Sequence, residues 1–429
     1  MRVVHLFQSL GCGGTEKRAL ELCRFTAARG CEHRFLAAQP GNYFADECAA
    51  EGIPVIYAPA ARFADAILSL TPDVLHVHYW GFGGWWAQVV PPAHACSPIL
   101  ETVHNRTPAW VDERVRRIVL VSHHGTGPQP ERDERFTVIY AGVDTQAYRP
   151  LGRRQEARRA LSIPPGAAVV GRVARLELDK AEPAHFLAYL DLAEAAPEVA
   201  VVIVGDGSFR GELEGRVAAR GLSSRFVFTG WRKDASFLME AFDVLMHTTR
   251  DEPFGGVIVE ALAKGLPVVA SAAGAIPEVL GDPPAGILAA STEAAVKATI
   301  ELVRDPARQR FLTAAALQRA GLFDARRTAE QYWALYRELA GREADAAPAE
   351  AGPPRVIGLS VRQEILDVLP GPAQGRPVED APMAAGPAPA PADGSGLAER
   401  VVDRIVSRLA RTDAAHRIAR RVLDERRRA

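Results

Sequence analysis

The segment Asp243–Ser271, DVLMHTTRDEPFGGVIVEALAKGLPVVAS, combines a strand, a turn, a helix and a second strand in one short run. Its first apolar residues predict a strand that ends at His247, and Gly255 and Gly256 then open a helix of about two turns. Gly265 ends that helix, and another apolar run follows at once. A unit of this kind is typical of a parallel sheet whose faces are covered by helices.

The same alternation extends through most of the chain. In the first half, strands are expected at RVVHLF, RFLAAQ, PVIYA, DVLHVH, PILETVH, RIVLVS and FTVIYAG. The pattern restarts after Arg149 with AAVVGRVAR, VAVVIVGDG, RFVFTGW, FDVLMHT and LPVVAS. Two successive doubly wound units predict two Rossmann-like domains that face a cleft, with ligands bound at the carboxyl ends of the strands. The expected boundaries are residues 1–148, residues 149–325 and a closing helix at residues 326–342.

The composition changes after residue 342. Residues 343–396 are rich in Ala, Pro and Gly and predict a linker. Residues 397–429 carry ten arginines against five acidic residues, and apolar residues recur at helical spacing, which predicts a basic amphipathic helix. Three interpretations stay open for this tail: a helix that docks on its own core, a contact with an anionic membrane, or a coiled-coil contact with a partner or a second copy in a homodimer.

The net charge and the cysteine content argue against some classes of protein. A net charge of −1 gives no general attraction for nucleic acid, so no nucleic-acid partner is expected. The five cysteines lie in the first hundred residues without the spacing of a zinc site, which favours reduced thiols. The apolar run at the N-terminus is too short for the core of a signal peptide. Residues 74–100 carry no Asp, Glu, Lys or Arg, but glycines and prolines interrupt them, so we do not expect a membrane span there. We expect a cytoplasmic protein, with the tail as a route to peripheral contact at the inner membrane face.

The segment Asp243–Ser271 also contains candidate ligand-binding residues. Gly255 and Gly256 at a helix N-terminus let a phosphate approach free backbone N–H groups, and the helix dipole favours an anion there. Glu252 and Glu260 would repel phosphate, so they suit neutral hydroxyls such as those of a sugar. Glu260 lies in an apolar run, where an unpaired buried carboxylate would be costly unless a diol satisfied it. The alternative places Glu260 on an exposed helix edge and Glu252 in a surface loop.

This double-glutamate element, with Pro-Phe-Gly after the first glutamate and LPVVASAAGAIPEVL after the second, resembles the signature of retaining GT-B glycosyltransferases of family 4. Further motifs keep the family's order across roughly residues 1–340: GCGGTEK, DVLHVH, TVHN, VIYAGVDTQAYRP, GRVARLELDK, VIVGDGS and FTGW. The resemblance implies a GT-B fold in the α/β class. It also implies a metal-independent hexosyltransferase that uses a nucleotide sugar, UDP-linked rather than GDP-linked. The acceptor would be a hydroxyl of a small natural product or of a glycan or lipid intermediate.

The resemblance assigns roles to individual residues. Arg175 and Lys180 would clamp the donor diphosphate, and Glu260 would accept hydrogen bonds from the ribose. The catalytic pair would be His104 and Glu252, at the reacting sugar. The remaining donor-binding residues would offer backbone to the donor: Gly13, Gly14, Phe254, Gly255 and Gly256. No Asp-x-Asp motif is present, and no metal or cofactor is expected, because two fixed cations and a helix N-terminus supply the positive charge that the leaving group needs.

The chain departs from the family pattern at two places. GRVARLELDK carries extra residues, so Arg172 competes with Arg175 for the diphosphate, although the spacing to Lys180 favours Arg175. Ala275 stands where a second glycine is common, which narrows the space beside the donor. Arg175 and Lys180 are also compatible with solvated loop charges.

Plainer interpretations also exist for the other candidates. His104 is compatible with a core histidine, and Gly13 and Gly14 with turn geometry alone. His76 and His78 share one face of a strand like a pair of metal ligands, but no third ligand follows, which favours packing.

Acceptor recognition is assigned to the aromatic stretch HYWGFGGWW. Its candidates are Tyr79, Trp80 and Trp85, which would stack on a sugar or ring-bearing acceptor; packing against a helix is the alternative. Two other function classes are alternatives to a glycosyltransferase. A nucleotide-sugar 2-epimerase would share the architecture without the double-glutamate signature. A non-catalytic sugar-nucleotide-binding scaffold acting through the tail would be favoured if Arg175, Lys180 or Glu260 were missing.

Overall fold

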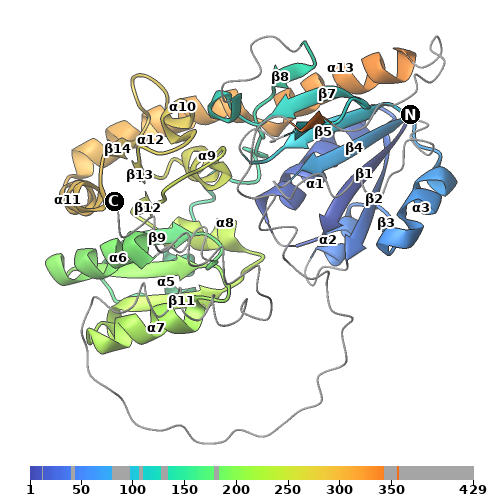
Figure 1. The fold of residues 1–429 in the computed structure, drawn as a ribbon. Coiled ribbons are helices and arrows are strands. Elements are labelled where there is room, and N and C mark those ends of the chain that lie inside the picture. The colour runs from blue at the N-terminus through green and yellow to red at the C-terminus, as the bar shows by residue number, and fades with distance from the viewer. Residues whose placement is uncertain are drawn as a thin grey trace, which may run out of the picture. The chain divides into compact units, whose positions relative to one another are not determined.

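Two parallel β-sheets organise the chain (Figure 1). The computed structural model describes residues 1–11, 13–39, 44–79, 97–105, 110–126, 134–177, 183–342 and 355–356. The predicted linker and tail therefore lie outside the described residues, apart from the short strand β15 (Arg355–Val356). Another short strand, β6 (Trp110–Val111), does not belong to the two large sheets. Across the described ranges, none of the helices has both the length and the apolar character needed to cross a bilayer.

The first sheet has seven strands in the order β3-β2-β1-β4-β5-β7-β8, and all its pairings are parallel. The chain moves outward from β1 to β3 and then returns to β4 on the other side of β1, which makes a doubly wound sheet with its switch point between β1 and β4. The bounds are β1 (Arg2–Ser9), β2 (Glu32–Gln39), β3 (Val55–Tyr57), β4 (Val74–Tyr79), β5 (Ile99–Val103), β7 (Val115–Leu120) and β8 (Phe136–Val138).

The second sheet repeats this plan with six parallel strands in the order β11-β10-β9-β12-β13-β14. Its switch point lies between β9 and β12. All six residues of β10 are buried, as expected for a parallel strand that is covered on both faces. The bounds are β9 (Ala168–Val173), β10 (Val199–Val204), β11 (Phe226–Gly230), β12 (Val244–His247), β13 (Val268–Ser271) and β14 (Ile287–Ala289).

Helices connect and cover the strands. In the first half they are α1 (Gly14–Ala27), α2 (Ala45–Ala50) and α3 (Phe63–Leu70). The later helices are α5 (Arg154–Ala160), α6 (Pro183–Ala195), α7 (Arg210–Ala219), α8 (Ala235–Leu238), α9 (Gly256–Ala263), α10 (Ile276–Leu280), α11 (Thr292–Val303), α12 (Pro306–Ala320) and α13 (Ala325–Arg342). Short 3₁₀ turns are η1 (Ala60–Arg62), η3 (His123–Thr126), η5 (Ser223–Arg225), η6 (Met239–Ala241) and η7 (Gly321–Phe323).

The closing helix α13 returns to the first domain. Its Tyr332, Tyr336 and Leu339 pack into a buried cluster with Val3 of β1 and Val74 of β4, and α13 also contacts α1. One face of the first sheet is therefore covered by α1 together with α13, the orange helix of Figure 1.

The expected two-domain α/β architecture is confirmed. Residues 292–320 form two helices, α11 and α12, because Asp305 caps the second through the backbone N–H of Arg308 and Pro306 occupies its first turn. The short helices α2, α3, α5 and α10 and the edge strand β14 were not expected.

Candidate functional site

The segment Asp243–Ser271 folds as its sequence predicts. Strand β12 ends at His247, and α9 begins at Gly256. Gly255 precedes the helix with φ of 93°, and Gly265 follows it with φ of 66°, a region of backbone conformation that favours glycine. The backbone N–H groups of Ile258 and Val259 bond to the carbonyl of Gly255, so the N–H groups before them have no acceptor within the helix. This end of α9 is therefore suited to an anion or a polar ligand.

Glu252 is a fixed, buried carboxylate at the same place. Only 9% of its surface is exposed, and its Oε2 lies 3.1 Å from Nε2 of His247, which must donate because a carboxylate only accepts. Its carbonyl accepts from the N–H of Ala275 at 2.8 Å. A Cβ at Gly274, whose φ is 57°, would lie 2.2 Å from that carbonyl oxygen. The surface-loop interpretation of Glu252 is wrong.

Glu260 is also buried, with 8% of its surface exposed, so it does not occupy an exposed helix edge. Its Oε1 accepts from Lys17 Nζ at 3.1 Å and from Arg18 Nη2 at 3.0 Å, both on α1. The sequence suggested that a diol makes the buried Glu260 carboxylate tolerable, and this explanation needs correction. In the ligand-free protein two cations from α1 satisfy this carboxylate, and a diol is not required to do so.

The charges of this cluster set the ionisation of Glu260. Burial alone would raise the pKa of its carboxyl, but the cations of Lys17 and Arg18 and a hydrogen bond with Tyr148 outweigh burial and lower the pKa below its usual value. The Tyr148 hydroxyl also contacts the Lys17 ammonium. Glu260 is consequently ionised at neutral pH and able to accept hydrogen bonds from a ligand.

The two candidate arginines of GRVARLELDK, Arg172 and Arg175, have different environments. Arg172 lies in β9 with 1% of its surface exposed, and its guanidinium donates to the Tyr189 hydroxyl and to the Thr248 carbonyl, both at 3.2 Å. Arg175 is partly exposed just beyond the strand. Burial raises the pKa of the Glu16 carboxyl on α1, and the nearby charge of Arg175 opposes only part of that rise. Arg172 is therefore a buried core residue, whereas Arg175 lies at the carboxyl edge of the sheet, where a ligand could reach it.

Glycines hold the loop that carries Arg175. A Cβ at Gly205 would lie 1.9 Å from the Ala174 carbonyl oxygen, and one at Gly207 would lie 2.5 Å from the backbone of Leu176. The VIVGDGS motif therefore lets the turns after β9 and β10 pack backbone against backbone. Lys180, the second expected diphosphate clamp, lies outside the described residues.

The glycines at the two helix starts are not all explained by packing. A Cβ at Gly13 would lie 2.8 Å from Oε2 of Glu16, so packing accounts for that glycine. Gly14 and Gly256 have no positive φ, and beyond their immediate chain neighbours a Cβ at either would meet no described atom within 4 Å. Neither turn geometry nor packing requires glycine at these two positions.

Phe254 is buried, with 5% of its surface exposed. Its ring centroid lies 6.1 Å from that of Tyr140 and 5.8 Å from that of Phe323. His104 lies immediately after β5, and its Nε2 is 3.0 Å from Nδ1 of His78. Of the acceptor candidates, Trp80 and Trp85 lie outside the described residues, and Tyr79 is described only as the last residue of β4.

The sequence did not predict that α1 supplies the charges of this site. Glu16, Lys17 and Arg18 occupy its first turns and meet Arg175 and Glu260 of the second domain. The motif GCGGTEK contains the first two of these residues, Glu16 and Lys17, and the run of charged residues after its glycine pair was the available sign.

Two models of known protein families match the chain. The model "Glycosyl transferases group 1" matches residues 153–319, and the model "Glycosyltransferase Family 4" matches residues 12–147. The two matched ranges together take up more than half of the chain. The chain belongs to the group 1, or family 4, glycosyltransferases.

Curated relatives include the D-inositol 3-phosphate glycosyltransferases of Mycobacterium bovis and Mycobacterium tuberculosis, each 31% identical over 311 residues. The match covers 63% of this chain and 62% of the length of these relatives.

Similar solved structures include Anabaena HepE in complex with UDP and glucose, with a TM-score of 0.69, 23% identity, and coverage of 79% of this chain and 100% of that one. Another is WaaG, a glycosyltransferase involved in lipopolysaccharide biosynthesis, with a TM-score of 0.64, 17% identity and the same coverage. These likenesses establish the GT-B fold.

Proposed function

We propose that the protein is a metal-independent, retaining glycosyltransferase that takes its sugar from a nucleoside diphosphate sugar, UDP-linked in preference to GDP-linked, and transfers it to an acceptor hydroxyl. The observation that carries the proposal is the meeting of α1 with the second domain. Its first turns approach Arg175 on one side and Glu260 on the other, beside the free N–H groups of α9. A nucleotide sugar offers a diphosphate, a diol and a sugar to these groups.

Each part of the site matches one part of such a donor. The guanidinium of Arg175 and the N-terminus of α9 suit the diphosphate, where negative charge grows as the glycosidic bond breaks. The ionised carboxylate of Glu260 suits the ribose hydroxyls; both of its ion pairs end on Oε1, so they do not use the lone pairs of Oε2. Glu252, oriented by His247, suits a hydroxyl of the donor sugar.

The unexplained glycines support the same proposal. Gly14 and Gly256 each begin a helix, and a ligand that approaches the backbone closely accounts for the absence of a side chain at both. The solved complexes of Anabaena HepE with UDP, with UDP and glucose and with UDP-glucose favour UDP over GDP as the nucleotide. The acceptor is a hydroxyl compound of a natural-product, glycan or lipid pathway.

The proposed mechanism uses only groups of the chain and of the substrates. The donor sugar loses its bond to the diphosphate on the same face that the acceptor hydroxyl attacks, and the acceptor proton passes to the departing phosphate oxygen. A cytoplasmic location stays a prediction. Contact of the tail with a membrane, a partner or a second copy also stays a prediction, because residues 397–429 lie outside the described part of the chain.

Thermal unfolding with a panel of UDP, GDP and their sugar conjugates, in the presence of EDTA, tests this proposal. A ligand at about 100 times its dissociation constant adds about 2.7 kcal/mol to the free energy of unfolding. We expect UDP and a UDP-sugar to protect the wild type, and Arg175→Ala to lose that protection while keeping the ligand-free melting temperature, because Arg175 is partly exposed. Absence of protection by every nucleotide at millimolar concentration would overturn the transferase proposal.

A further inference from the structure

Four histidines and a threonine form a hydrogen-bonded line through the first domain, here called the histidine row. Thr26 Oγ1 lies 2.8 Å from Nε2 of His33, and Nδ1 of His33 lies 3.0 Å from Nε2 of His5. Nδ1 of His5 lies 3.0 Å from Nε2 of His78, and Nδ1 of His78 lies 3.0 Å from Nε2 of His104. The row thus joins the buried side of α1 to the candidate catalytic histidine.

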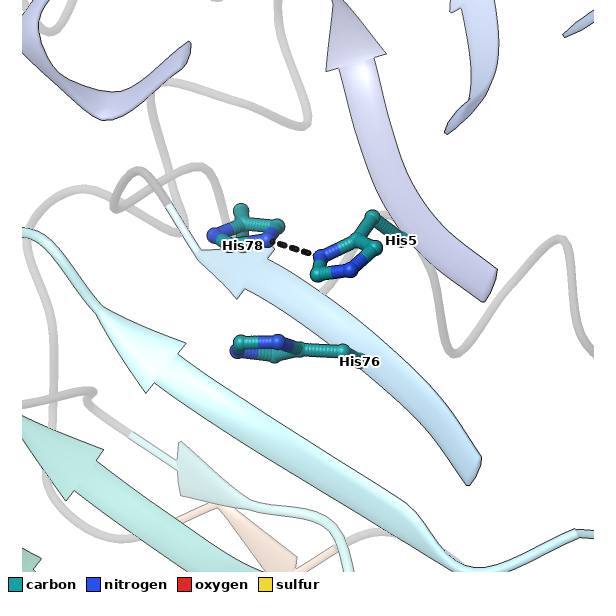
Figure 2. A group of neighbouring side chains, drawn as sticks. All are labelled: His5, His76 and His78. Carbon is teal, nitrogen blue, oxygen red and sulfur yellow. Dashed lines mark hydrogen bonds between the residues drawn. The ribbon is translucent and has the colours of Figure 1, made fainter. Parts of the chain in front are cut away.

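The order of strands produces this row. His5 lies in β1, His33 in β2 and His78 in β4, and these three strands are neighbours in the sheet. Figure 2 shows the rings of His5 and His78 joined across two strands, with the ring of His76 beside them. His5, His33, His78 and Thr26 are each at most 5% exposed, whereas His104 at the carboxyl edge of the sheet is partly exposed.

A metal site is the first alternative, because ring nitrogens of His5, His76 and His78 lie within 4.8 Å of one another. The rings of His76 and His78 face each other with centroids 4.2 Å apart and planes at 32°, so their in-plane lone pairs do not converge on one point. Both nitrogens of His76 also contact hydroxyl groups, those of Tyr336 and Thr102, at 2.7 Å. Hydrogen bonding accounts for this cluster better than coordination does.

The second group with metal-ligand spacing combines His5 and His33 with Cys23. Its two imidazoles already bond to each other through Nε2 of His5 and Nδ1 of His33, and the Cys23 sulfur lies 3.4 Å from the same Nε2. Burial raises the pKa of the Cys23 thiol well above its usual value, which opposes the thiolate that a metal requires. This group also serves the histidine row.

The direction of every hydrogen bond in the row follows from its buried end. The Thr26 hydroxyl has one proton, and its contact of 2.7 Å with the Leu22 carbonyl uses it, because a carbonyl only accepts. Thr26 Oγ1 must therefore accept from Nε2–H of His33. A neutral imidazole that donates from one nitrogen accepts at the other, so Nδ1 of His33 accepts from Nε2–H of His5.

The same rule carries the direction to the edge of the sheet. Nδ1 of His5 accepts from Nε2–H of His78, and Nδ1 of His78 accepts from Nε2–H of His104. His104 then has its proton on Nε2 and a lone pair on Nδ1. The rule requires neutral rings, and burial supplies this condition: it lowers the pKa of His33 to about 4 and that of His104 to about 3, and those of His5 and His78 well below their usual value.

We infer that Thr26, acting through His33, His5 and His78, holds His104 as the Nε2–H tautomer, so that His104 meets its ligand through Nδ1 as a hydrogen-bond acceptor. Such a group binds a sugar hydroxyl and does not bind a phosphate oxygen, which needs a donor. Thr26, His33, His5 and His78 are positioning residues, and His104 alone touches the ligand. The sugar-binding part rests on the proposed function, whereas the tautomer is a property of the ligand-free protein.

Nitrogen NMR of protein labelled with ¹⁵N-histidine tests the tautomer directly, with His104→Gln used to assign the resonances. At pH 7 without ligand, we expect a protonated Nε2 and an unprotonated Nδ1 for His104. Thr26→Ser keeps the hydroxyl and should keep this tautomer. Thr26→Val removes the fixed acceptor, so a mixture of both tautomers should appear. A protonated Nδ1 in the wild type, or a wild-type spectrum in Thr26→Val, would overturn the inference.

Binding measurements with the same variants separate this inference from the proposed function. One hydrogen bond is worth about a fivefold change in affinity. Because Thr26→Val leaves a mixture of tautomers, we expect it to weaken binding of a UDP-sugar by about twofold to fivefold and to leave binding of UDP alone unchanged, with Thr26→Ser restoring the wild-type value. Equal weakening for both ligands would contradict the role in sugar recognition. If the wild type binds neither ligand, the proposed function fails, and the NMR result still decides the tautomer.

Discussion

Replacing Glu260 by Ala in the ligand-free protein distinguishes two explanations for this buried carboxylate. If only a ribose diol satisfied Glu260, the free protein would hold an unpaired buried charge, and its removal would leave stability unchanged or raise it. The structure instead pairs Glu260 with Arg18 and Lys17 at 3.0 and 3.1 Å. The sign of the change in the free energy of unfolding therefore separates the explanations.

The magnitude follows from the burial of each partner. The side chains of Glu260 and Arg18 are 11% and 8% exposed, and removing one partner of a buried ion pair costs about 3–5 kcal/mol. Arg18 keeps a second ion pair with Glu21 at 3.1 Å, and the Lys17 side chain is 41% exposed, so its ammonium regains water. We therefore expect a loss of about 3 kcal/mol. For a protein of this size the melting temperature would fall by about 4 °C.

Differential scanning calorimetry of wild type, Glu260→Ala and Lys17→Ala at neutral pH measures this effect. Lys17→Ala is the matched control: it removes a partner whose side chain is 41% exposed, and Glu260 keeps Arg18, so we expect a change below about 1 kcal/mol. An unchanged or raised melting temperature in Glu260→Ala would refute the ion-pair explanation and restore the diol as the group that makes this carboxylate tolerable.

Two further predictions concern acid and the glycines. His33 has its pKa lowered to about 4 by burial, so the unfolded chain binds the proton more readily than the folded one, and stability falls as pH drops from about 6.5. At pH 5 this costs about 2 kcal/mol, and urea unfolding should show that cost reduced in His33→Gln. Gly14→Ala and Gly256→Ala should keep or raise the melting temperature, because a Cβ there meets no described atom beyond the immediate chain neighbours within 4 Å, and should weaken UDP binding, because the proposed donor approaches these positions. Gly274→Ala should lower the melting temperature, because its Cβ would meet the Glu252 backbone; unaltered UDP affinity in the first two would contradict their role.

The sequence predicted the architecture because its information is local. Apolar runs set the strands, and glycines such as Gly255 and Gly265 marked where α9 begins and ends. Short helices such as α5 and α10 have too few residues to show a helical period, so they were missed.

The charge partners in the site could not be predicted in the same way. Lys17 and Glu260 are 243 residues apart in the chain, and only the folded structure brings their side chains within 3.1 Å of each other. The sequence placed His76 and His78 on one face, but the histidine row also needs the order of β1, β2 and β4 in the sheet. Local patterns do not contain that order.

Calorimetric titration with UDP in the presence of EDTA tests the central claim most directly, namely that the second domain binds a nucleoside diphosphate without a metal through Arg175 and Glu260. We predict one UDP per chain for the wild type, affinity at least tenfold weaker in Arg175→Ala, because a charge-assisted contact to the diphosphate is lost, and comparable weakening in Glu260→Ala. No binding at millimolar UDP, binding only after a divalent metal is added, or wild-type affinity in both variants would contradict the account.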